Sequence, residues 1–545
     1  MSDIASFLSG KVLFITGATG FLAKGLLAKI LLDARDVQRI YLLIRADGEN
    51  SVEQRLEREV LQANALARVR EMHGARFNDL MREKVVAVGG DLTQDKLGID
   101  ANRYAQLTRE VDIVINSAAS VVFDEEIDQA LQLNTLGPGR LVEFARACRD
   151  AVFLHVSTAY VNGLRTGRVP EELISPDQAV AQIIKGFHKS YKLESEIDSI
   201  LAFTRQVIKE SGSPELHAEF RTAIARRNNG KLITEHRLKR ELESLRNRWV
   251  KRRLVDEGTR RARELGWHDT YTFTKAMGEQ IIAKSRGDIP TIIVRPSIIE
   301  SSLIDPVSGW LDGLKVADPL IAHYSKGRLP DFPADPDIVL DLIPVDIVAN
   351  AILAALPGAR QTKEIQVYQV ATGSENPLKL GEMFDLMHDY FRKYPMQNRR
   401  GQPIRVTRWT YPTPERFRRY YQLRYRMPLR AMRWMIKTFS ALPWSPRLKQ
   451  KVSVLEATLD RVLALTEIYS PYMHHDCRFG TENTRRLYEA MGPEDRKRFN
   501  FDVGRIEWQE YIQDIHIPAL KRHVMKEAGS PSSRADTRNL SPQAL

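Results

Sequence analysis

The sequence predicts an α/β protein built on a doubly wound parallel sheet, with a mostly helical domain after it. Short apolar runs alternate with helix-length segments up to about residue 400, and the first run leads straight into a glycine turn. The later chain is basic and aromatic and has no strand-like run. We therefore expect domains over residues 1–400 and 401–527, and a disordered tail over 528–545 because that segment is small and polar.

The composition is that of a soluble globular protein, since 43% of the 545 residues are hydrophobic and 28% are charged. Two cysteines exclude a disulfide framework and suit a reducing cytoplasm, which is the expected location. The start of the chain lacks the features of a signal peptide, and no apolar run is long enough to span a bilayer. The net charge of +12 favours an anionic partner, which charge alone does not identify.

The expected strands are continuous apolar runs, as in a parallel sheet whose two faces are both covered by helices. In chain order they lie within "KVLFITG", "RIYLLIR", "KVVAVGGDL", "VDIVINSAA", "VFLHVSTAYV", "PTIIVRPSII" and "EIQVYQVA". Helix-length segments separate most of these runs, and a crossover helix is what joins two parallel strands. The runs therefore predict one parallel sheet.

The alternation breaks between about residues 165 and 268. Two long charged segments, "HKSYKLESEIDSILAFTRQVIKE" and "LITEHRLKRELESLRNRWVKRRLVDEGTRRARELG", have helical patterns, and the second is markedly basic. We expect a helical insertion between the fifth strand and the segment "YTFTK". Its basic residues form either a solvated face or a surface that attracts anionic substrates, for which Arg248, Lys251, Arg252 and Arg253 are the candidates.

The segment "GATGFLA" predicts a dinucleotide site. Gly17 and Gly20 follow the first strand and open a helix, where bare backbone allows a sharp turn and a close approach of the pyrophosphate. Ala23 stands at the third small position, where helix and strand pack closely. A glycine motif alone also fits an ordinary tight turn, but its place between strand and helix favours nucleotide binding.

The end of the second strand predicts NADPH as the cofactor. Enzymes that use NAD usually place an acid there, whereas this chain has Arg45, whose guanidinium can bind a 2′-phosphate. Arg55 is a second candidate contact, and Asp47 is the nearby acid, two residues further along. The alternative for Arg45 is a solvated arginine at a strand end.

Tyr271 and Lys275, in "YTFTK", share one face of a predicted helix. Such a pair is weak evidence by itself and gains meaning beside a nicotinamide site. A free tyrosine has a pKa near 10, and a nearby ammonium favours its phenolate, which suits a proton donor. The pair therefore predicts acid catalysis.

This arrangement resembles the short-chain dehydrogenase/reductase superfamily in its extended form, which has a Rossmann sheet. The resemblance implies that Tyr271 donates a proton while Lys275 lowers its pKa and holds the nicotinamide ribose. It also implies a catalytic hydroxyl at Thr158, with Ser157 as the alternative, bonded to the substrate carbonyl oxygen. The cofactor contacts expected from motif and resemblance together are Thr16, Gly17, Thr19, Gly20, Phe21, Leu22, Arg45, Arg55, Asp91, Leu92, Asn116, Ala118, Ala119, Asn134, Tyr271, Lys275, Pro296, Ser297 and Ile298.

Further phrases resemble the fatty acyl-CoA reductase family. They are "TGATGFLAKGLLAKIL", "YLLIR", "STAYVNG", "YTFTKAMGE", "RPSII", "IPVD", "NTRRLYEAM" and "FNFDVGRIEWQEYI". The resemblance implies NADPH-dependent reduction of a long-chain acyl-CoA or acyl carrier protein thioester through an aldehyde to a primary alcohol. The chain departs from the family at Ala23, where glycine is commoner, and in the length of its insertion.

Three alternatives stay open: an aldehyde-forming thioester reductase, a nucleotide-sugar epimerase or dehydratase of the same superfamily, and a non-catalytic dinucleotide sensor. No metal site is expected, because the ligand-type residues of "HHDC" are adjacent and have no second cluster. No nucleic-acid motif is present. The segment "PLRAMRWMIKTFSALPW" suits either a core helix or a peripheral membrane contact. The sequence predicts no oligomeric state.

Overall fold

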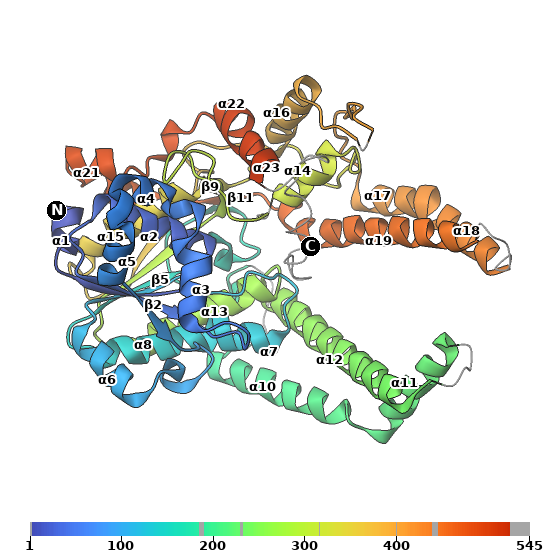
Figure 1. The fold of residues 1–545 in the computed structure, drawn as a ribbon, viewed down its shortest axis with the longest axis horizontal. Helices are drawn as coiled ribbons and strands as arrows, with labels where there is room; N and C mark the ends of the chain where they lie inside the picture. Colours follow the sequence, from blue (N-terminus) through green and yellow to red (C-terminus); the bar gives the residue numbers. More distant parts are fainter. Residues whose placement is uncertain are drawn as a thin grey trace. The chain divides into compact units, whose positions relative to one another are not determined.

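The computed structural model describes residues 3–184, 190–228, 233–314, 317–398, 400–438 and 445–523 (Figure 1). Contacts divide the chain into two compact units. The first comprises Met1–Ser297, Asp346–Ala371 and Phe479–Asp502, and the second comprises Ile298–Val345, Thr372–Arg478 and Val503–Leu545. The units therefore interleave along the chain, which differs from a single boundary at residue 400. The predicted tail lies outside the described residues.

The first unit is built on a seven-stranded sheet with the order β10-β7-β5-β4-β1-β2-β3. Every pairing in it is parallel, and all seven predicted strands are present. Their bounds are β1 (Val12–Thr16), β2 (Arg39–Ile44), β3 (Val85–Gly89), β4 (Ile113–Asn116), β5 (Val152–Val156), β7 (Thr291–Pro296) and β10 (Gln366–Val370). This order reverses at β1 and β4, where doubly wound sheets bind their ligands.

Helices cover both faces of this sheet (Figure 1). The figure places α2 (Phe21–Asp33) and α15 (Val345–Ala355) on one side and α8 (Gly137–Ala147) and α13 (Thr270–Ser285) on the other. The other helices of this unit before the insertion and after β10 are α1 (Ile4–Leu8), α3 (Val52–Arg55), α4 (Ala67–His73), α5 (Phe77–Lys84), α6 (Ala101–Glu110), α7 (Ile127–Ala130), α20 (Glu482–Glu489) and α21 (Pro493–Arg498).

The strand register lines up three polar side chains inside the apolar sheet. Thr16 pairs with Asn116, and Asn116 pairs with His155, at or near the carboxyl ends of β1, β4 and β5. All three side chains are fully buried. Buried polar groups need hydrogen-bond partners, so these residues are expected to bond to one another across the strands. The candidate site below is built on this row.

A buried ion pair fixes α13 on the sheet. Arg295 of β7 donates from Nε to Glu279 Oε1 at 2.9 Å and from Nη2 to Glu279 Oε2 at 2.6 Å, and its Nη1 donates to the Glu172 carbonyl at 2.9 Å. Both side chains are almost completely shielded from solvent. The two parallel bonds fix the rotation of α13 as well as its distance from β7.

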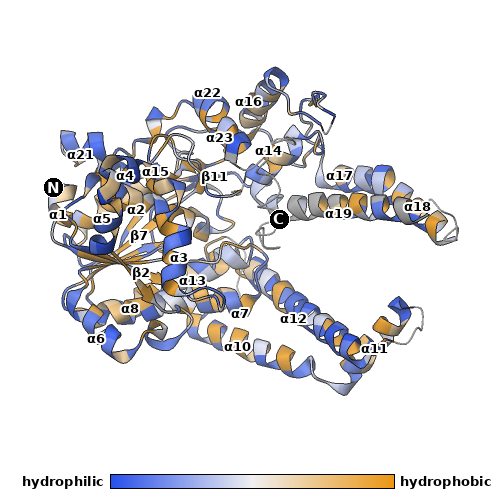
Figure 2. Cartoon of the chain, in the orientation of Figure 1, coloured by the Kyte–Doolittle hydropathy of each residue, from blue (hydrophilic) through white to orange (hydrophobic). Residues whose placement is uncertain are grey.

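The predicted helical insertion is confirmed, although residues 185–189 and 229–232 lie outside the described part. It contains β6 (Gly167–Val169), α9 (Val180–Ile183), α10 (Leu193–Glu210), α11 (Pro214–Arg227) and α12 (Glu235–Leu265). Ile200 and Leu254 join the core around Phe273, whereas Phe220, Ile224 and Leu242 form a separate small core. Figure 2 shows that most residues along α12 are hydrophilic.

A buried carboxylate ties residues 479–502 to the first unit. Glu171 accepts hydrogen bonds from the backbone nitrogens of Asn483 and Thr484 in α20, from the Thr484 hydroxyl at 2.7 Å and from the Gln369 backbone nitrogen at 2.6 Å. A carboxylate beside the first turn of a helix is favourable because it satisfies unpaired N–H groups there. This contact explains how a late segment belongs to the first unit.

The second unit is mostly helical, as predicted. Its elements are β8 (Ile298–Glu300), α14 (Asp318–Ser325), β9 (Leu342–Pro344), α16 (Leu380–Lys393), α17 (Pro414–Tyr421), α18 (Met427–Thr438), α19 (Ser445–Tyr469), α22 (Trp508–Glu510), a π-helical segment η11 (Tyr511–His516) and α23 (Ile517–His523). The parallel pair β8–β9 was not predicted. Within the described ranges, no helix is both long enough and apolar enough to cross a bilayer.

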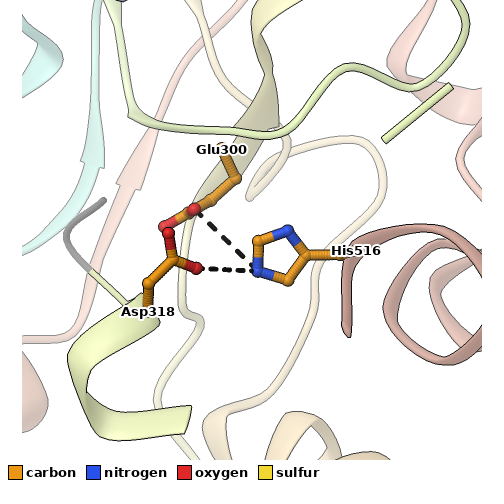
Figure 3. A group of neighbouring side chains, drawn as sticks. All are labelled: Glu300, Asp318 and His516. Carbon is orange, nitrogen blue, oxygen red and sulfur yellow. Dashed lines mark ion pairs between the residues drawn. The ribbon is translucent and has the colours of Figure 1, made fainter. Parts of the chain in front are cut away.

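Three buried ionisable side chains join distant segments of the second unit (Figure 3). His516 Nε2 lies 3.1 Å from Asp318 Oδ1 and 4.0 Å from Glu300 Oε2. The other ring nitrogen of His516 lies 2.9 Å from the Ser301 hydroxyl. Burial opposes the charge on His516, but the hydrogen bond and charge of Asp318 raise its pKa overall. The cluster connects β8, the start of α14 and η11.

We expect Glu279→Gln to lower the free energy of unfolding by about 3–5 kcal/mol, because it leaves the Arg295 guanidinium buried without a counter-charge. Urea denaturation followed by circular dichroism measures the change. The matched control is Asp150→Asn at the exposed pair with Arg360, where we expect a loss of at most about 1 kcal/mol. Equal small losses in both variants would contradict a dominant role for the buried pair.

Candidate active site

The glycine turn between β1 and α2 has the geometry of a phosphate cradle. Gly17 has φ +70°, and a Cβ on it would lie 2.8 Å from backbone atoms of Ser117 and Ala118. Gly20 donates from its backbone nitrogen to the Gly17 carbonyl at 2.8 Å and precedes α2 directly. Bare backbone at a helix N-terminus suits a pyrophosphate. Thr19, Phe21 and Leu22 lie in the same turn and first helical residues, as predicted.

Arg45 lies directly after β2, where the sequence placed a 2′-phosphate contact. Its side chain is 69% exposed, and its Nη1 lies 3.7 Å from Asp91 Oδ2. Asp47 instead accepts from the Asn50 backbone nitrogen at 2.8 Å within its own loop. An exposed guanidinium at the strand end therefore remains available to an anion.

Arg55, the second predicted contact, is already engaged. It donates to both oxygens of Glu59 at 2.8 and 2.9 Å, and its Nη1 donates to the Arg45 carbonyl. Only 17% of its side chain is exposed. In this structure Arg55 holds the loop that carries Arg45, so its predicted contact with the cofactor stays a prediction.

The residues after β3 and β4 form the neighbouring wall. Asp91 accepts from the Thr93 backbone nitrogen at 2.8 Å, and the side chain of Leu92 is buried. Ala118 and Ala119 follow Asn116 and are half-buried. These residues lie at the carboxyl edge of the sheet, as the predicted cofactor site requires.

Asn134, a predicted cofactor contact, positions this wall because its side chain bonds to the backbone of Ser120. It lies in the π-helical segment η5 (Leu131–Leu136). Its Oδ1 accepts from the Ser120 nitrogen at 2.9 Å, and its Nδ2 donates to the Ser120 carbonyl at 3.0 Å and to the Thr274 hydroxyl at 3.2 Å. Asn134 thus links the loop that holds Ala118 and Ala119 to α13.

Tyr271 and Thr158 meet at the start of α13. The Tyr271 ring is half-buried and lies 6.0 Å from the Phe123 ring, edge to face. Burial raises the pKa of Tyr271, the charge of Asp269 adds to this, and a hydrogen bond with the Thr158 side chain opposes it. Ser157 Oγ is buried and makes no hydrogen bond within the described ranges. The hydroxyl that contacts Tyr271 is therefore that of Thr158.

Lys275 lies one turn after Tyr271 and is fully buried. Its Nζ donates to the Val156 carbonyl at 2.7 Å and lies 3.3 Å from His155 Nε2. Burial lowers the pKa of Lys275 to about 8, and the charge of Glu279 opposes this shift. The charge that acts on Tyr271 here is that of Asp269, so the expected lowering of its pKa by Lys275 is not seen in this structure.

The last predicted contacts, Pro296, Ser297 and Ile298, begin at the final residue of β7. The Pro296 carbonyl accepts from the Thr158 hydroxyl at 3.4 Å, and the Ser297 backbone nitrogen donates to the Val370 carbonyl at 3.0 Å. Ile298 begins β8 in the second unit. Pro296 and Ser297 therefore close the same sheet edge beside β10, whereas Ile298 belongs to another element.

Sequence reasoning did not identify His155 and Glu279 as site residues. Glu279 holds α13, and His155 contacts both Asn116, at 2.9 Å, and Lys275. The available signal for His155 was a single histidine in the apolar run "VFLHV". A polar residue in a central strand must find a partner, and here the partner lies in the predicted site.

Comparison with known proteins identifies the family. Models described as "Male sterility protein" match residues 15–352 and 445–527. The chain is 36% identical to fatty acyl-CoA reductase 2, chloroplastic, of Arabidopsis thaliana, over 96% of this chain and 80% of that one. It is 31% identical to the alcohol-forming fatty acyl-CoA reductase of Simmondsia chinensis, over 96% and 99% of the two chains.

Solved structures agree on the fold. The reductase domain of a non-ribosomal peptide synthetase from Mycobacterium tuberculosis has a TM-score of 0.52 and 17% identity, over 96% of this chain and 95% of that one. The terminal R domain of the myxalamid pathway has a TM-score of 0.50 and 15% identity, over 89% and 86%. Fold, site geometry and relatives agree: the chain belongs to the fatty acyl-CoA reductase family.

Proposed function

We propose that this chain reduces a long-chain acyl-CoA or acyl carrier protein thioester through an aldehyde to a primary alcohol, with NADPH as reductant. One arrangement carries the proposal. Tyr271 is hydrogen-bonded to Thr158 and stands one turn before the buried Lys275, at the same edge of the sheet as a glycine turn that suits a pyrophosphate. The alcohol-forming relative from Simmondsia chinensis supports the product.

The nicotinamide cofactor, when bound, supplies the hydride. The turn at Gly17 and Gly20 would hold its pyrophosphate, because Gly17 packs its bare backbone against Ser117 and Ala118 and Gly20 leads directly into the N-terminus of α2. Arg45 would bind the 2′-phosphate, since its guanidinium is exposed and the nearby Asp47 is committed to its own loop. These observations support NADPH over NADH.

Tyr271 would protonate the oxygen that becomes the alcohol. Its raised pKa keeps the hydroxyl protonated at neutral pH, so the proton is present when negative charge develops on the substrate oxygen. Thr158 holds that hydroxyl and adds a second donor for the same oxygen. A protonated Lys275 would favour the phenolate left on Tyr271 after the transfer.

The experiment that tests this function is a count of NADPH consumed per product formed from a long-chain acyl-CoA. Two NADPH per alcohol are expected. One NADPH per released aldehyde would favour the aldehyde-forming alternative, and no consumption would overturn the proposal.

We expect Tyr271→Phe to bind NADPH normally and to lose at least ~10²-fold in the rate of aldehyde reduction, the usual scale for a positioned acid. NADPH fluorescence measures binding, and single-turnover kinetics measure the rate. Phe123→Leu, which changes the ring packed on Tyr271 but leaves the hydroxyl, is the matched control. Near-normal turnover of Tyr271→Phe would show that another group is the acid.

Arg45→Asp should weaken NADPH binding by one to two decades and leave NADH binding nearly unchanged, because a charge-assisted contact contributes about 1.5–3 kcal/mol. Dissociation constants for both cofactors test this. Arg58→Asp is the control, because Arg58 lies 13 positions after Arg45 and donates to the Asn50 side chain instead. Equal losses for NADPH and NADH would mean that Arg45 supports the fold alone.

The insertion supports a role for basic residues in substrate capture. Arg248 lines a cavity of about 720 Å³ together with Arg227, Arg237, Arg240 and Glu241, and Glu241 is paired with Arg237 at 2.9 Å. Lys251 and Arg252 are exposed on α12. Arg253, the fourth candidate, already has partners within the insertion: its guanidinium lies over the Trp249 ring at 5.4 Å and 3.7 Å from the Glu210 carboxylate.

Reversing Arg248, Lys251 and Arg252 to Glu should raise KM for acyl-CoA and weaken its dependence on salt, because exposed charges steer an anion over about a Debye length. Reduction of a free long-chain aldehyde, which has no phosphates, should hardly change. Steady-state kinetics at several salt concentrations test this, with Arg76→Glu and Arg82→Glu as a control elsewhere in the first unit. Equal effects on both substrates would show that these residues are structural.

A further inference from the structure

A continuous hydrogen-bonded row crosses three strands and ends at the lysine. Thr16 Oγ1 lies 2.7 Å from Asn116 Oδ1, Asn116 Nδ2 lies 2.9 Å from His155 Nδ1, and His155 Nε2 lies 3.3 Å from Lys275 Nζ. All four side chains are buried. The row therefore joins β1, which precedes the glycine turn, to the amine of Lys275, which lies one turn after Tyr271 on α13.

The direction of the bonds along this row is set at Asn116. Its Oδ1 accepts from the Thr16 hydroxyl at 2.7 Å and from the Ala118 backbone nitrogen at 3.3 Å. That nitrogen can only donate, and it shares its hydrogen with Thr16 Oγ1, which is also 3.3 Å away. The amide nitrogen must then face His155, so His155 Nδ1 is the acceptor of that bond. A neutral ring that accepts at Nδ1 carries its proton on Nε2, and that proton points at Lys275.

The charge of Lys275 is incompatible with this direction. An ammonium has only donors, so an Nε2–H group of His155 would face another donor. A neutral amine has a lone pair, so it can accept a hydrogen bond from the Nε2–H group of His155 while it still donates one to the Val156 carbonyl. For a charged Lys275 the ring must carry its proton on Nδ1, and Asn116 must turn its oxygen toward the ring, which leaves the Ala118 nitrogen with Thr16 Oγ1 as its acceptor.

We propose that His155 is a positioning residue that couples the protonation of Lys275 to its own tautomer and to the orientation of the Asn116 amide. This inference rests on the proposed function, because it concerns the lysine of that site. The orientation in this structure is the one that fits the amine. When Lys275 gains its proton, the ring changes from the Nε2–H to the Nδ1–H tautomer.

Other charged groups around Lys275 do not replace this control. Glu279, one turn later on α13, is paired with Arg295 from β7, and its charge favours the protonated form of Lys275 without contacting the His155 ring; Tyr271 lies one turn earlier. From β5 the amine meets His155 and the Val156 carbonyl. Burial and the neighbouring Lys275 lower the pKa of His155 well below its ordinary value, so the ring stays neutral while Lys275 titrates.

The test is a pH titration of the full chain labelled with ¹⁵N histidine, because ¹⁵N shifts distinguish the two neutral tautomers without any turnover. His155→Phe assigns the signal. We expect the ring to change from Nδ1–H to Nε2–H as pH rises through the Lys275 pKa, which burial lowers to about 8. In Lys275→Met, which keeps the length of the side chain but cannot titrate, one tautomer should persist throughout.

One tautomer across the whole range in the unsubstituted protein would overturn the inference, as would the same change in Lys275→Met. A kinetic measurement links it to turnover: kcat should fall on the alkaline side with the midpoint of the tautomer change, because the amine form of Lys275 no longer favours the phenolate. The two failures are distinguishable. A protein without reductase activity that still changes tautomer would overturn the proposed function and leave the coupling intact.

Discussion

The site depends on one buried ion pair, because Arg295 and Glu279 decide where α13 lies on the sheet. Tyr271 and Lys275 both belong to α13, and their useful direction depends on the rotation of that helix. A bidentate guanidinium–carboxylate pair fixes rotation better than apolar contacts do, since its two bonds are directional. Burying both charges costs desolvation free energy, so the pair is better explained by specificity of position than by stability.

The strands, the glycine turn and the Tyr271/Lys275 helix could be predicted from the sequence because local patterns determine them. A continuous apolar run such as Val12–Thr16 has few alternatives to a central parallel strand, and Gly17 adopts a backbone conformation that side chains disfavour. Arg45 was placed correctly at the end of β2 for the same reason. These features involve residues close together in the chain.

The rest depends on pairings between distant residues, which spacing along the chain does not reveal. Asn134 acts on the Ser120 backbone and on α13, and Glu171 holds residues more than three hundred positions later. The role of His155 needed the register of β4 against β5, because a shift by one residue would turn its ring to the other face of the sheet. The short β8–β9 pair escaped prediction since its strands have three residues each.

The polar row also shows how a buried lysine can persist in an apolar sheet. A fully buried ammonium with no matching acceptors would be costly, so such a group either loses its proton or finds partners. Lys275 has a permanent acceptor in the Val156 carbonyl and a variable partner in His155, whose ring can donate or accept. The imidazole therefore tolerates both forms of the lysine, whereas an apolar side chain at position 155 would offer the lysine neither a donor nor an acceptor. A residue that serves only packing does not need a ring that can either donate or accept a hydrogen bond. This property is the physical reason to place His155 in the site.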